Sequence, residues 1–286
     1  MTRHIYINGS YLPESEAKIS VMDRAFLFGD AIYEVTAMVD GHLIDNDLHL
    51  ARFARSLAEL AIALPLPLDQ VRAMQIELAR RNQMTDGTIY LQVSRGVAER
   101  NFLPMADMAP TFVAFTQPKK LYDTPAQHKG IAVALVEDPR WNRRDIKTVM
   151  LLGQVLAKQS AAAQGFADVW LHEDGTITEG ASSTAFILTH DGKIVTRPNS
   201  HAILPGCTRR AVMTLAERHA LTIEERPFTI TEAQAAAEAF LTSASSLVTP
   251  VVRMGDAVIG DGTPGPVTRR LQQIYLEAAR ACEKII

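Results

Sequence analysis

The most informative segment for the architecture, residues 31–41, reads Ala-Ile-Tyr-Glu-Val-Thr-Ala-Met-Val-Asp-Gly. Its first nine residues are mostly apolar or β-branched, which predicts a strand buried on at least one face. Asp40-Gly41 accepts the positive φ angles of a tight hairpin turn, and Asn8-Gly9 gives the same signal after the β-prone residues His4–Ile7. Both signals predict antiparallel hairpins early in the chain.

Helical patterns alternate with further strand patterns along the rest of the chain. Apolar residues recur at spacings of three or four from Asp47, which predicts a helix ended by Pro65 and Pro67. Residues 23–30 read as an irregular segment. Other helices are expected at 69–81, 148–164, 208–219, 231–237 and 266–284, and strands at 88–93, 111–115, 131–136, 167–172, 177–179, 183–188, 193–196, 239–242 and 248–253. This mixture predicts an α+β fold with mostly antiparallel sheets.

Composition places the chain among ordinary globular proteins. It has 286 residues with 29 basic and 32 acidic side chains, a net charge of -3 and 47% hydrophobic residues, which excludes a disordered chain. The basic residues are scattered, which argues against a nucleic-acid surface. The length favours two domains. With polar residues 117–125 as the candidate linker, we expect a small N-terminal domain over 1–117, a linker over 118–127 and a larger C-terminal domain over 128–286.

Cysteine usage and hydropathy bear on location. Only Cys207 and Cys282 occur, too few for a disulfide scaffold, which indicates a reducing compartment and predicts a cytoplasmic protein. The first twenty residues lack the apolar region of a signal peptide, and no window approaches the roughly 18–20 apolar residues that span a bilayer. We therefore expect small-molecule partners and neither a membrane nor a nucleic acid as partner.

One lysine and three polar segments could carry chemistry, whereas the common metal-binding, hydrolase and P-loop motifs are absent from the sequence. Lys147 falls between an extended segment and a helix, and a lysine amine can form a Schiff base with a carbonyl when its pKa is lowered. Residues 178–184, 241–246 and 206–209 are rich in hydroxyl groups or begin a helix, so each could bind an anion. Taken alone, a surface lysine and ordinary turns would explain the same residues.

Five motifs in order give the chain a family resemblance. It resembles the fold-type IV pyridoxal-phosphate (PLP) enzymes, most of all the D-amino-acid aminotransferases, over nearly its full length. This resemblance implies PLP as cofactor and an α+β fold of two domains, with a small α/β sandwich-like N-terminal domain and a larger C-terminal domain with a β-barrel-like core. The motifs are Asp23-Arg24-x-x-x-Phe28-Gly29-Asp30-x-x-Tyr33-Glu34, Arg52 in its helix, Asp145-Ile146-Lys147, Glu179-Gly180-x-Ser182-Ser183 and Leu204-Pro205-Gly206-x-Thr208-Arg209.

The resemblance implies a role for each matched residue. Lys147 matches the catalytic lysine, which carries PLP as an aldimine and then moves a proton between Cα and C4′. Glu179 matches the carboxylate that faces the pyridine nitrogen and keeps it protonated. Arg52 matches the arginine that pairs with the phosphate. The remaining cofactor-binding residues that it implies are Ser182, Ser183, Leu204, Cys207, Thr208, Ser243, Ala244 and Ser245.

The match is looser where the substrate binds. The implied substrate-binding residues are Tyr33, Val35, Arg100 and Phe102. D-amino-acid aminotransferases commonly present an Arg-x-His trap for the substrate carboxylate, and this chain has Arg100 but places Phe102 at the histidine position. Arg100 can still bind a carboxylate with two hydrogen bonds. We expect the loss of the second donor to weaken the anchor and to admit bulkier D-amino acids or (R)-amines.

The implied reaction is PLP-dependent transamination between a D-amino acid similar to D-alanine and a 2-oxo acid, either pyruvate or 2-oxoglutarate. The resemblance also implies a homodimer, with a site between the two domains that a neighbouring subunit completes. Two alternatives share the fold: a branched-chain L-amino-acid aminotransferase and 4-amino-4-deoxychorismate lyase. A silent PLP-binding protein is the alternative outside the enzymes. Tyr33, Glu34 and Arg100 favour the D-specific transaminase, and the presence of both Lys147 and Glu179 argues against a silent binder.

Overall fold

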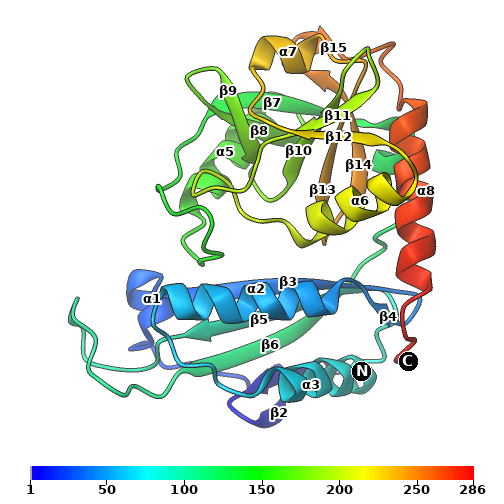
Figure 1. The fold of residues 1–286 in the computed structure, drawn as a ribbon. Coiled ribbons are helices and arrows are strands. Elements are labelled where there is room, and N and C mark those ends of the chain that lie inside the picture. The colour runs from blue at the N-terminus through cyan, green and yellow to red at the C-terminus, as the bar shows by residue number, and fades with distance from the viewer. Residues whose placement is uncertain (1) are drawn as a thin grey trace. The chain divides into compact units, whose positions relative to one another are not determined.

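The computed structural model describes residues 2–286, which form two compact units (Figure 1). The first unit contains the chain up to Lys120 together with Ile146–Met150 and Ala279–Ile286, and the second contains Leu121–Asp145 and Leu151–Ala278. The predicted domain limits, 1–117 and 128–286 with a linker between them, stay a prediction. The structure adds that two short segments from later in the sequence pack with the first unit.

An antiparallel sheet forms the framework of the first unit, with strands in the order β2-β1-β6-β5-β3-β4. Asn8 and Gly9 connect β1 to β2, and Asp40 and Gly41 connect β3 to β4, all four with positive φ angles. Both predicted hairpins are therefore confirmed. The strands are β1 (His4–Ile7), β2 (Ser10–Pro13), β3 (Ala31–Val39), β4 (His42–Leu43), β5 (Gly87–Ser94) and β6 (Thr111–Pro118).

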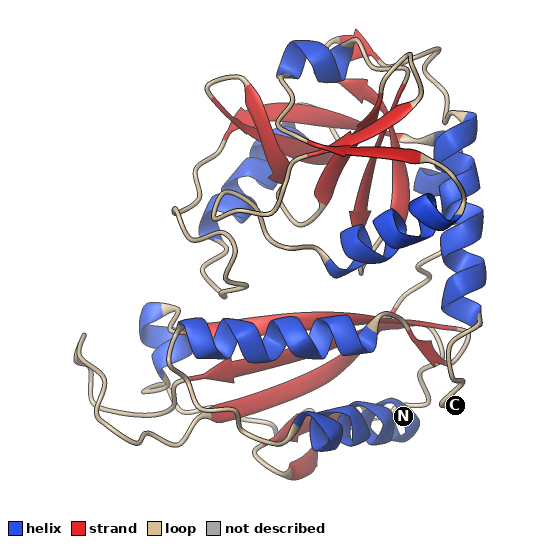
Figure 2. Ribbon diagram, viewed as in Figure 1, coloured by secondary structure: helices blue, strands red, loops and turns tan. Residues whose placement is uncertain are grey.

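Two long helices pack on this sheet, α2 (Asn46–Glu59) and α3 (Leu68–Arg81) (Figure 2). Phe53 of α2 packs on Phe112 of β6, and the apolar residues of both helices join one buried cluster with the sheet. The predicted helix to Pro65 is too long, because the backbone of Ala61 turns to a φ of 49°. The segment before β3 contains a short helix, α1 (Arg24–Phe28), where an irregular segment was expected.

The segment around Lys147 pairs with β3 instead of starting a helix. The backbone N–H of Tyr33 donates to the carbonyl of Lys147 at 2.9 Å, and the N–H of Val149 donates to the carbonyl of Ala31 at 3.1 Å. Ile32 and Thr148 form the bridge between them. The expectation of a helix from residue 148 was thus wrong at its start: α5 runs over Leu152–Ala163, because strand pairing holds the preceding residues extended.

The second unit is built on a mixed sheet in the order β12-β11-β10-β13-β14-β7-β8-β9, with β15 beside β14 (Figure 1). Three of its pairs are parallel, β11 with β12, β14 with β7 and β7 with β8. The sheet curls so that β9 contacts β10. Its strands are β7 (Ile131–Glu137), β8 (Asp168–Glu173), β9 (Thr176–Gly180), β10 (Thr184–Leu188), β11 (Lys193–Thr196), β12 (Thr222–Glu225), β13 (Glu238–Ser243), β14 (Leu247–Met254) and β15 (Ala257–Val258).

The helices of the second unit follow the predicted segments with small shifts at their ends, apart from the short α4, which was not expected (Figure 2). Besides α5, they are α4 (Pro125–Lys129), α6 (Cys207–Arg218), α7 (Ile230–Gln234) and α8 (Pro266–Arg280). The predicted α+β class is confirmed, and the curled sheet agrees with the expected β-barrel-like core. Within residues 2–286, no helix is both long and apolar enough to cross a membrane.

Candidate active site

Lys147 is fixed in the first unit by the strand pairing with β3. Its side chain is half-buried, and Nζ lies 4.2 Å from the centre of the Tyr33 ring. Tyr33 in turn stacks on Tyr90 of β5, with the ring centroids 5.5 Å apart. Side chains alternate along a strand, so Tyr33 and Val35 point to the face of β3 opposite to Glu34. The structure thus places the predicted lysine against the predicted tyrosine, with Val35 on the same face.

Arg52 belongs to a buried charge network on the other face of β3. Its Nε donates to Oε2 of Glu34 at 2.9 Å, and its second terminal nitrogen donates to Oε1 at 2.6 Å. Nδ1 of His49 lies 2.9 Å from the same Oε1. Burial alone would raise the pKa of Glu34, but the charges of Arg52 and His49 outweigh it and hold that pKa well below its usual range. The carboxylate therefore stays ionised and fixes the guanidinium of Arg52.

Arg100 and Phe102 lie in an exposed loop that Arg24 anchors. The two terminal nitrogens of Arg24 donate to the backbone carbonyls of Asn101, at 2.6 Å, and of Phe102, at 3.2 Å. The guanidinium of Arg100 lies 5.4 Å from the ring centre of Phe28 and 5.5 Å from that of Phe102. A cation over an aromatic face is attracted by the ring quadrupole. Phe102 thus holds Arg100 through its ring where the family pattern has a second hydrogen-bond donor.

Three segments of the second unit meet at one edge of the curled sheet. Thr184, the first residue of β10, pairs with Thr242 near the end of β13, so the β9–β10 turn and the β13–β14 turn lie side by side. The N-terminus of α6 approaches the same place, since a Cβ added at Gly206 would lie only 2.7 Å from Oγ1 of Thr184. This edge brings together the predicted residues Ser182, Ser183, Cys207, Thr208, Ser243, Ala244 and Ser245.

Several hydroxyl groups at this edge are buried without a partner. Among the residues that the structure describes, Oγ of Ser183 and the Oγ1 atoms of Thr208 and Thr242 have no hydrogen-bond partner. The cap residue of α6, Gly206, provides no side-chain hydrogen bond to the helix N-terminus. A buried hydroxyl without a partner is costly, and free N–H groups at a helix N-terminus favour an anion. The edge therefore has the donor set of an anion-binding cradle.

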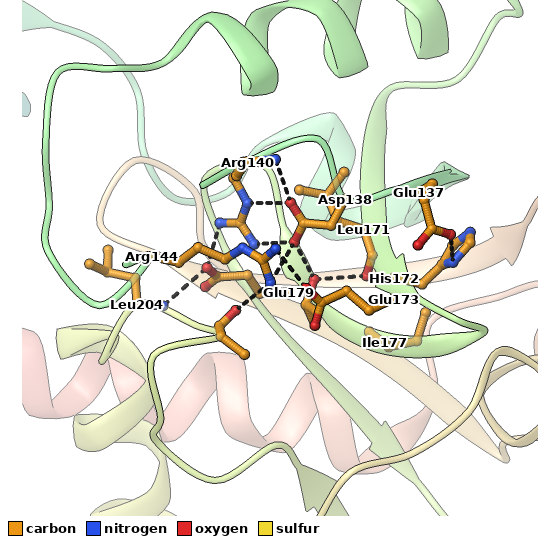
Figure 3. Close-up of polar contacts among 12 residues, drawn as sticks. Glu137, Asp138, Arg140, Arg144, Leu171, His172, Glu173, Ile177, Glu179 and Leu204 are labelled. Atoms are coloured by element: carbon orange, nitrogen blue, oxygen red, sulfur yellow. Dashed lines mark hydrogen bonds and ion pairs between the residues drawn. The ribbon is translucent and has the colours of Figure 1, made fainter. Parts of the chain in front are cut away.

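Glu179 lies at the end of β9, where Arg140 holds one of its oxygens (Figure 3). Oε1 accepts a hydrogen bond from Arg140 at 2.6 Å and one from the backbone N–H of Leu204 at 3.0 Å. Burial raises the pKa of Glu179, and the charge of Arg140 offsets only part of this effect. The predicted residues Glu179 and Leu204 are thus in direct contact, and the half-buried Leu204 is held by its own backbone.

Motif reasoning did not identify Arg140, His49 or Thr242 as site residues. Arg140 lies 2.6 Å from Glu179 but far from it in sequence, so only the fold reveals the pair. His49 stands one helical turn from Arg52, and this spacing could have suggested a shared partner. Thr242 lies within the hydroxyl-rich segment at 241–246, where the sequence did signal an anion site.

Replacing Glu34 by Gln should destabilise the protein in a pH-dependent way. Because the folded pKa lies below the ordinary value of 4.5, ionised Glu34 stabilises the fold above that pH, and the contribution is lost as the pH falls. At pH 7 we expect Glu34→Gln to reduce the free energy of unfolding by about 3–5 kcal/mol, since it leaves Arg52 buried without its counter-ion. The difference in the free energy of unfolding between the wild type and Glu34→Gln, measured by urea unfolding, should become smaller from pH 7 to pH 3.

The matched control is Glu77→Gln, which removes a surface pair with Arg81. Exposed ion pairs contribute at most about 1 kcal/mol, so this variant should stay close to the wild type at every pH. A gap for Glu34→Gln that is constant across the pH range would contradict the depressed pKa.

Known proteins similar to this chain include D-alanine aminotransferases and, among solved structures, branched-chain amino acid aminotransferases. The D-alanine aminotransferase of Staphylococcus aureus (strain N315) is 39% identical over 272 residues, which cover 94% of this chain and 95% of that protein. The D-alanine aminotransferase of Bacillus licheniformis is 36% identical over 268 residues, which cover 94% of each. Two solved structures share the fold of this chain.

A branched-chain amino acid aminotransferase from T.th., solved with pyridoxamine 5'-phosphate, superposes with a TM-score of 0.89 at 26% identity, covering 98% of this chain and 94% of that chain. The Escherichia coli branched-chain amino acid aminotransferase has a TM-score of 0.91 at 24% identity, covering 99% and 97%, which shows a shared fold. The family model of amino-transferase class IV matches residues 31–254. With a match over most of its length and relatives above one-third identity, the chain belongs to the class IV aminotransferases.

Proposed function

We propose that this protein is a PLP-dependent D-amino-acid aminotransferase. It transfers the amino group of a D-amino acid similar to D-alanine to a 2-oxo acid, pyruvate or 2-oxoglutarate. The observation that carries the proposal is the 39% identity with a D-alanine aminotransferase over 94% of the chain. Lys147 against Tyr33 and Glu179 against Arg140 support it, because a silent binding protein needs neither group.

The residues of the second unit fit the cofactor that class IV aminotransferases use. The phosphate of PLP is an anion, and the unpartnered hydroxyls of Ser183, Thr208 and Thr242 together with the N–H groups of Cys207 and Thr208 offer the donors that it needs. The remaining residues of this cradle are Ser182, Ser243, Ala244 and Ser245. Arg52, in the first unit, is the further candidate that the family resemblance gives for pairing with the phosphate, and its hydrogen bonds to Glu34 fix its guanidinium.

Lys147 and Glu179 have separate roles in the proposed mechanism. PLP supplies the carbonyl that accepts the amino group and the ring that accepts electrons when a Cα–H bond breaks. The amine of Lys147 would hold the cofactor covalently and, when free, would move a proton between Cα and C4′. Glu179 would hold a proton at the pyridine nitrogen, and Leu204 would lie beside the ring.

Arg100 is the proposed anchor of the substrate carboxylate, with Tyr33, Val35 and Phe102 as further substrate-binding residues. A guanidinium can bind a carboxylate through two parallel hydrogen bonds. The position of the carboxylate determines which face of the substrate meets Lys147, so the anchor selects the hand of the amino acid. Phe102 gives the loop an apolar side chain, which favours bulkier D-amino acids and (R)-amines as additional substrates.

The alternative with a specific observation behind it is a branched-chain L-amino-acid aminotransferase, since the T.th. structure that shares the fold at 26% identity is named for that activity. The D-alanine aminotransferases are 36–39% identical to this chain. Their higher identity favours the D-specific reaction. The lyase and the silent PLP-binding protein are outcomes of the test below.

The first test is the half-reaction without an acceptor. D-alanine should convert the visible absorption band of the bound cofactor to that of its pyridoxamine form, and L-leucine should leave the band unchanged. Lys147→Ala should slow the conversion by about 10²–10⁴-fold, because it removes the proton-transferring amine. The exposed Lys158→Ala, in α5, is the matched control and should react as the wild type does.

Each other outcome assigns the protein differently. Conversion by L-leucine alone would establish the branched-chain reaction. A band that neither amino acid changes would indicate the lyase or a silent binder, and a protein that takes up no PLP would overturn the proposal.

The second test concerns the carboxylate anchor. Arg100→Ala removes a charge-assisted interaction worth roughly 1.5–3 kcal/mol, so kcat/KM for D-alanine should fall by about one to two orders of magnitude. Phe102→His should raise the preference for D-alanine over (R)-phenylethylamine by supplying a second donor. Arg72→Ala, a surface arginine of α3, is the control. Unchanged D-alanine turnover in Arg100→Ala would remove the support for this anchor, and an unchanged preference in Phe102→His would show that position 102 does not set it.

The proposal includes a homodimer in the cytoplasm. Large apolar side chains are exposed near α1 and in the loop after β5, with Val21, Phe26, Phe102, Leu103 and Met105 all at least 65% exposed. Exposed apolar clusters are typical of association surfaces.

The small number of cysteines supports a reducing compartment. Fractionation of the source cells would test the location.

Sedimentation equilibrium tests the dimer. The wild type should have twice the 31.4 kDa mass of one chain, and Phe26→Lys should shift it toward the monomer by placing a charge in an apolar interface. Lys18→Glu, at an exposed polar position a few residues before the same helix, should leave the mass unchanged. A monomeric wild type at micromolar concentration would overturn the dimer.

A further inference from the structure

The charge network behind Glu179 points to a residue that acts on the reaction through another side chain (Figure 3). Arg140 stands between two buried carboxylates, with its first terminal nitrogen 2.6 Å from Oε1 of Glu179 and its second 2.7 Å from Oδ2 of Asp138. Its Nε also donates to Oδ1 of Asp138 at 2.9 Å. The side chain of Arg140 is only 6% exposed, so neither pair is screened by bulk water.

Asp138 fixes the orientation of Arg140. It accepts two hydrogen bonds from the guanidinium, and a third from the hydroxyl of Thr178 at 2.8 Å. Arg144 approaches Asp138 at 3.5 Å but turns its other terminal nitrogen to Glu173 at 2.7 Å. Arg140 is therefore the cation that contacts Glu179, and it has one defined orientation.

The two oxygens of Glu179 are unequal. Oε1 accepts hydrogen bonds from Arg140 and from the backbone N–H of Leu204. In the part of the chain that the structure describes, neither of these two residues donates a hydrogen bond to Oε2. Two donors on one oxygen fix the carboxylate plane and leave the other oxygen able to accept a further donor. In the proposed reaction that donor is the protonated pyridine nitrogen.

We propose that Arg140 is a positioning residue of the transamination, which keeps the shared proton on the pyridine nitrogen by stabilising Glu179 as a carboxylate. The inference rests on the proposed function, because it concerns the group that Glu179 faces. One proton is shared between the nitrogen and Oε2. When it lies on the nitrogen, the negative charge lies on the carboxylate beside Arg140, and when it lies on Oε2 the carboxyl is neutral. A fixed cation next to the carboxyl favours the first arrangement.

The surroundings make this contribution necessary. Burial raises the pKa of Glu179, and the negative charge of Asp138 acts in the same direction, so the carboxyl without Arg140 would tend to take the proton. Asp138 is itself held ionised against its burial, chiefly by its hydrogen bonds and charge interaction with Arg140, which keep its pKa low. The other charged groups of the network, Arg144 and Glu173, pair with each other and are present in all the Arg140 variants below.

Arg140→Gln is the decisive variant, studied as the holoenzyme loaded with PLP that carries ¹⁵N in its ring. The ¹⁵N chemical shift of the ring reports directly whether the nitrogen is protonated. In the wild type we expect the protonated value at neutral pH, and in Arg140→Gln a shift toward the unprotonated value. Each unit by which the pKa of Glu179 rises displaces the shared proton about tenfold toward the carboxyl. The kcat for D-alanine should fall by about tenfold or more, with a smaller change in KM.

Two further variants separate charge from structure. Arg140→Lys keeps a positive charge and should retain the protonated ring nitrogen. Arg140→His carries a charge that titrates, so that within one folded protein the ring nitrogen should lose its proton as the imidazole is neutralised at rising pH. Arg144→Gln is the matched control, because this buried arginine contacts Asp138 but not Glu179, and it should keep the wild-type ¹⁵N shift.

A second readout does not depend on the cofactor reaction. The ¹³C resonance of the Glu179 carboxyl, assigned by its loss in Glu179→Gln, should titrate at higher pH in Arg140→Gln than in the wild type. A wild type that fails to transaminate D-alanine would overturn the proposed function, while this titration would still test Arg140. A protonated ring nitrogen in Arg140→Gln, together with an unshifted Glu179 titration, would overturn the role of Arg140.

Discussion

Strand pairing along β3 is the constraint on which the position of Lys147 in the first unit depends. Residues around Lys147 lie between two segments of the second unit in sequence, yet their backbone bonds to Ala31 and Tyr33 place them in the first. Backbone pairing fixes both position and direction, so the amine of Lys147 faces Tyr33 and not Glu34. A lysine on a free loop would have to lose that freedom each time it reacted.

Local signals predicted the fold where local chemistry determines it. Asn8-Gly9 and Asp40-Gly41 form their turns because these residues tolerate positive φ, whatever surrounds them. The helical pattern from residue 148 failed because long-range pairing with β3 overrides helix propensity at its first residues. The sequence pattern did not predict the strand at 222–225, because this segment is polar. Its place in the sheet comes from a parallel partner, β11. Tertiary pairing thus explains what the sequence pattern missed.

The same distinction applies to the site. Motifs predicted Lys147, Glu179 and the anion cradle because each lies within a short run of characteristic residues. Their partners could not be predicted in this way. Arg140, just after β7, meets Glu179 of β9, and Arg52 meets Glu34 between a helix and a strand. Sequence therefore indicates which groups are candidates for carrying chemistry, whereas the fold determines which charges lie beside them and so how they ionise.

Glu34 and Glu179 show why those neighbours matter. Both carboxyls are buried, but the pKa of Glu34 is lowered and that of Glu179 is raised. Glu34 contacts both Arg52 and His49 and uses both oxygens, whereas Glu179 has Arg140, which it shares with Asp138. A fully paired carboxylate serves as a rigid support for Arg52. A carboxylate with one shared cation can still gain free energy from a second positive partner, which is the condition that the proposed contact of Glu179 with a protonated ring nitrogen requires.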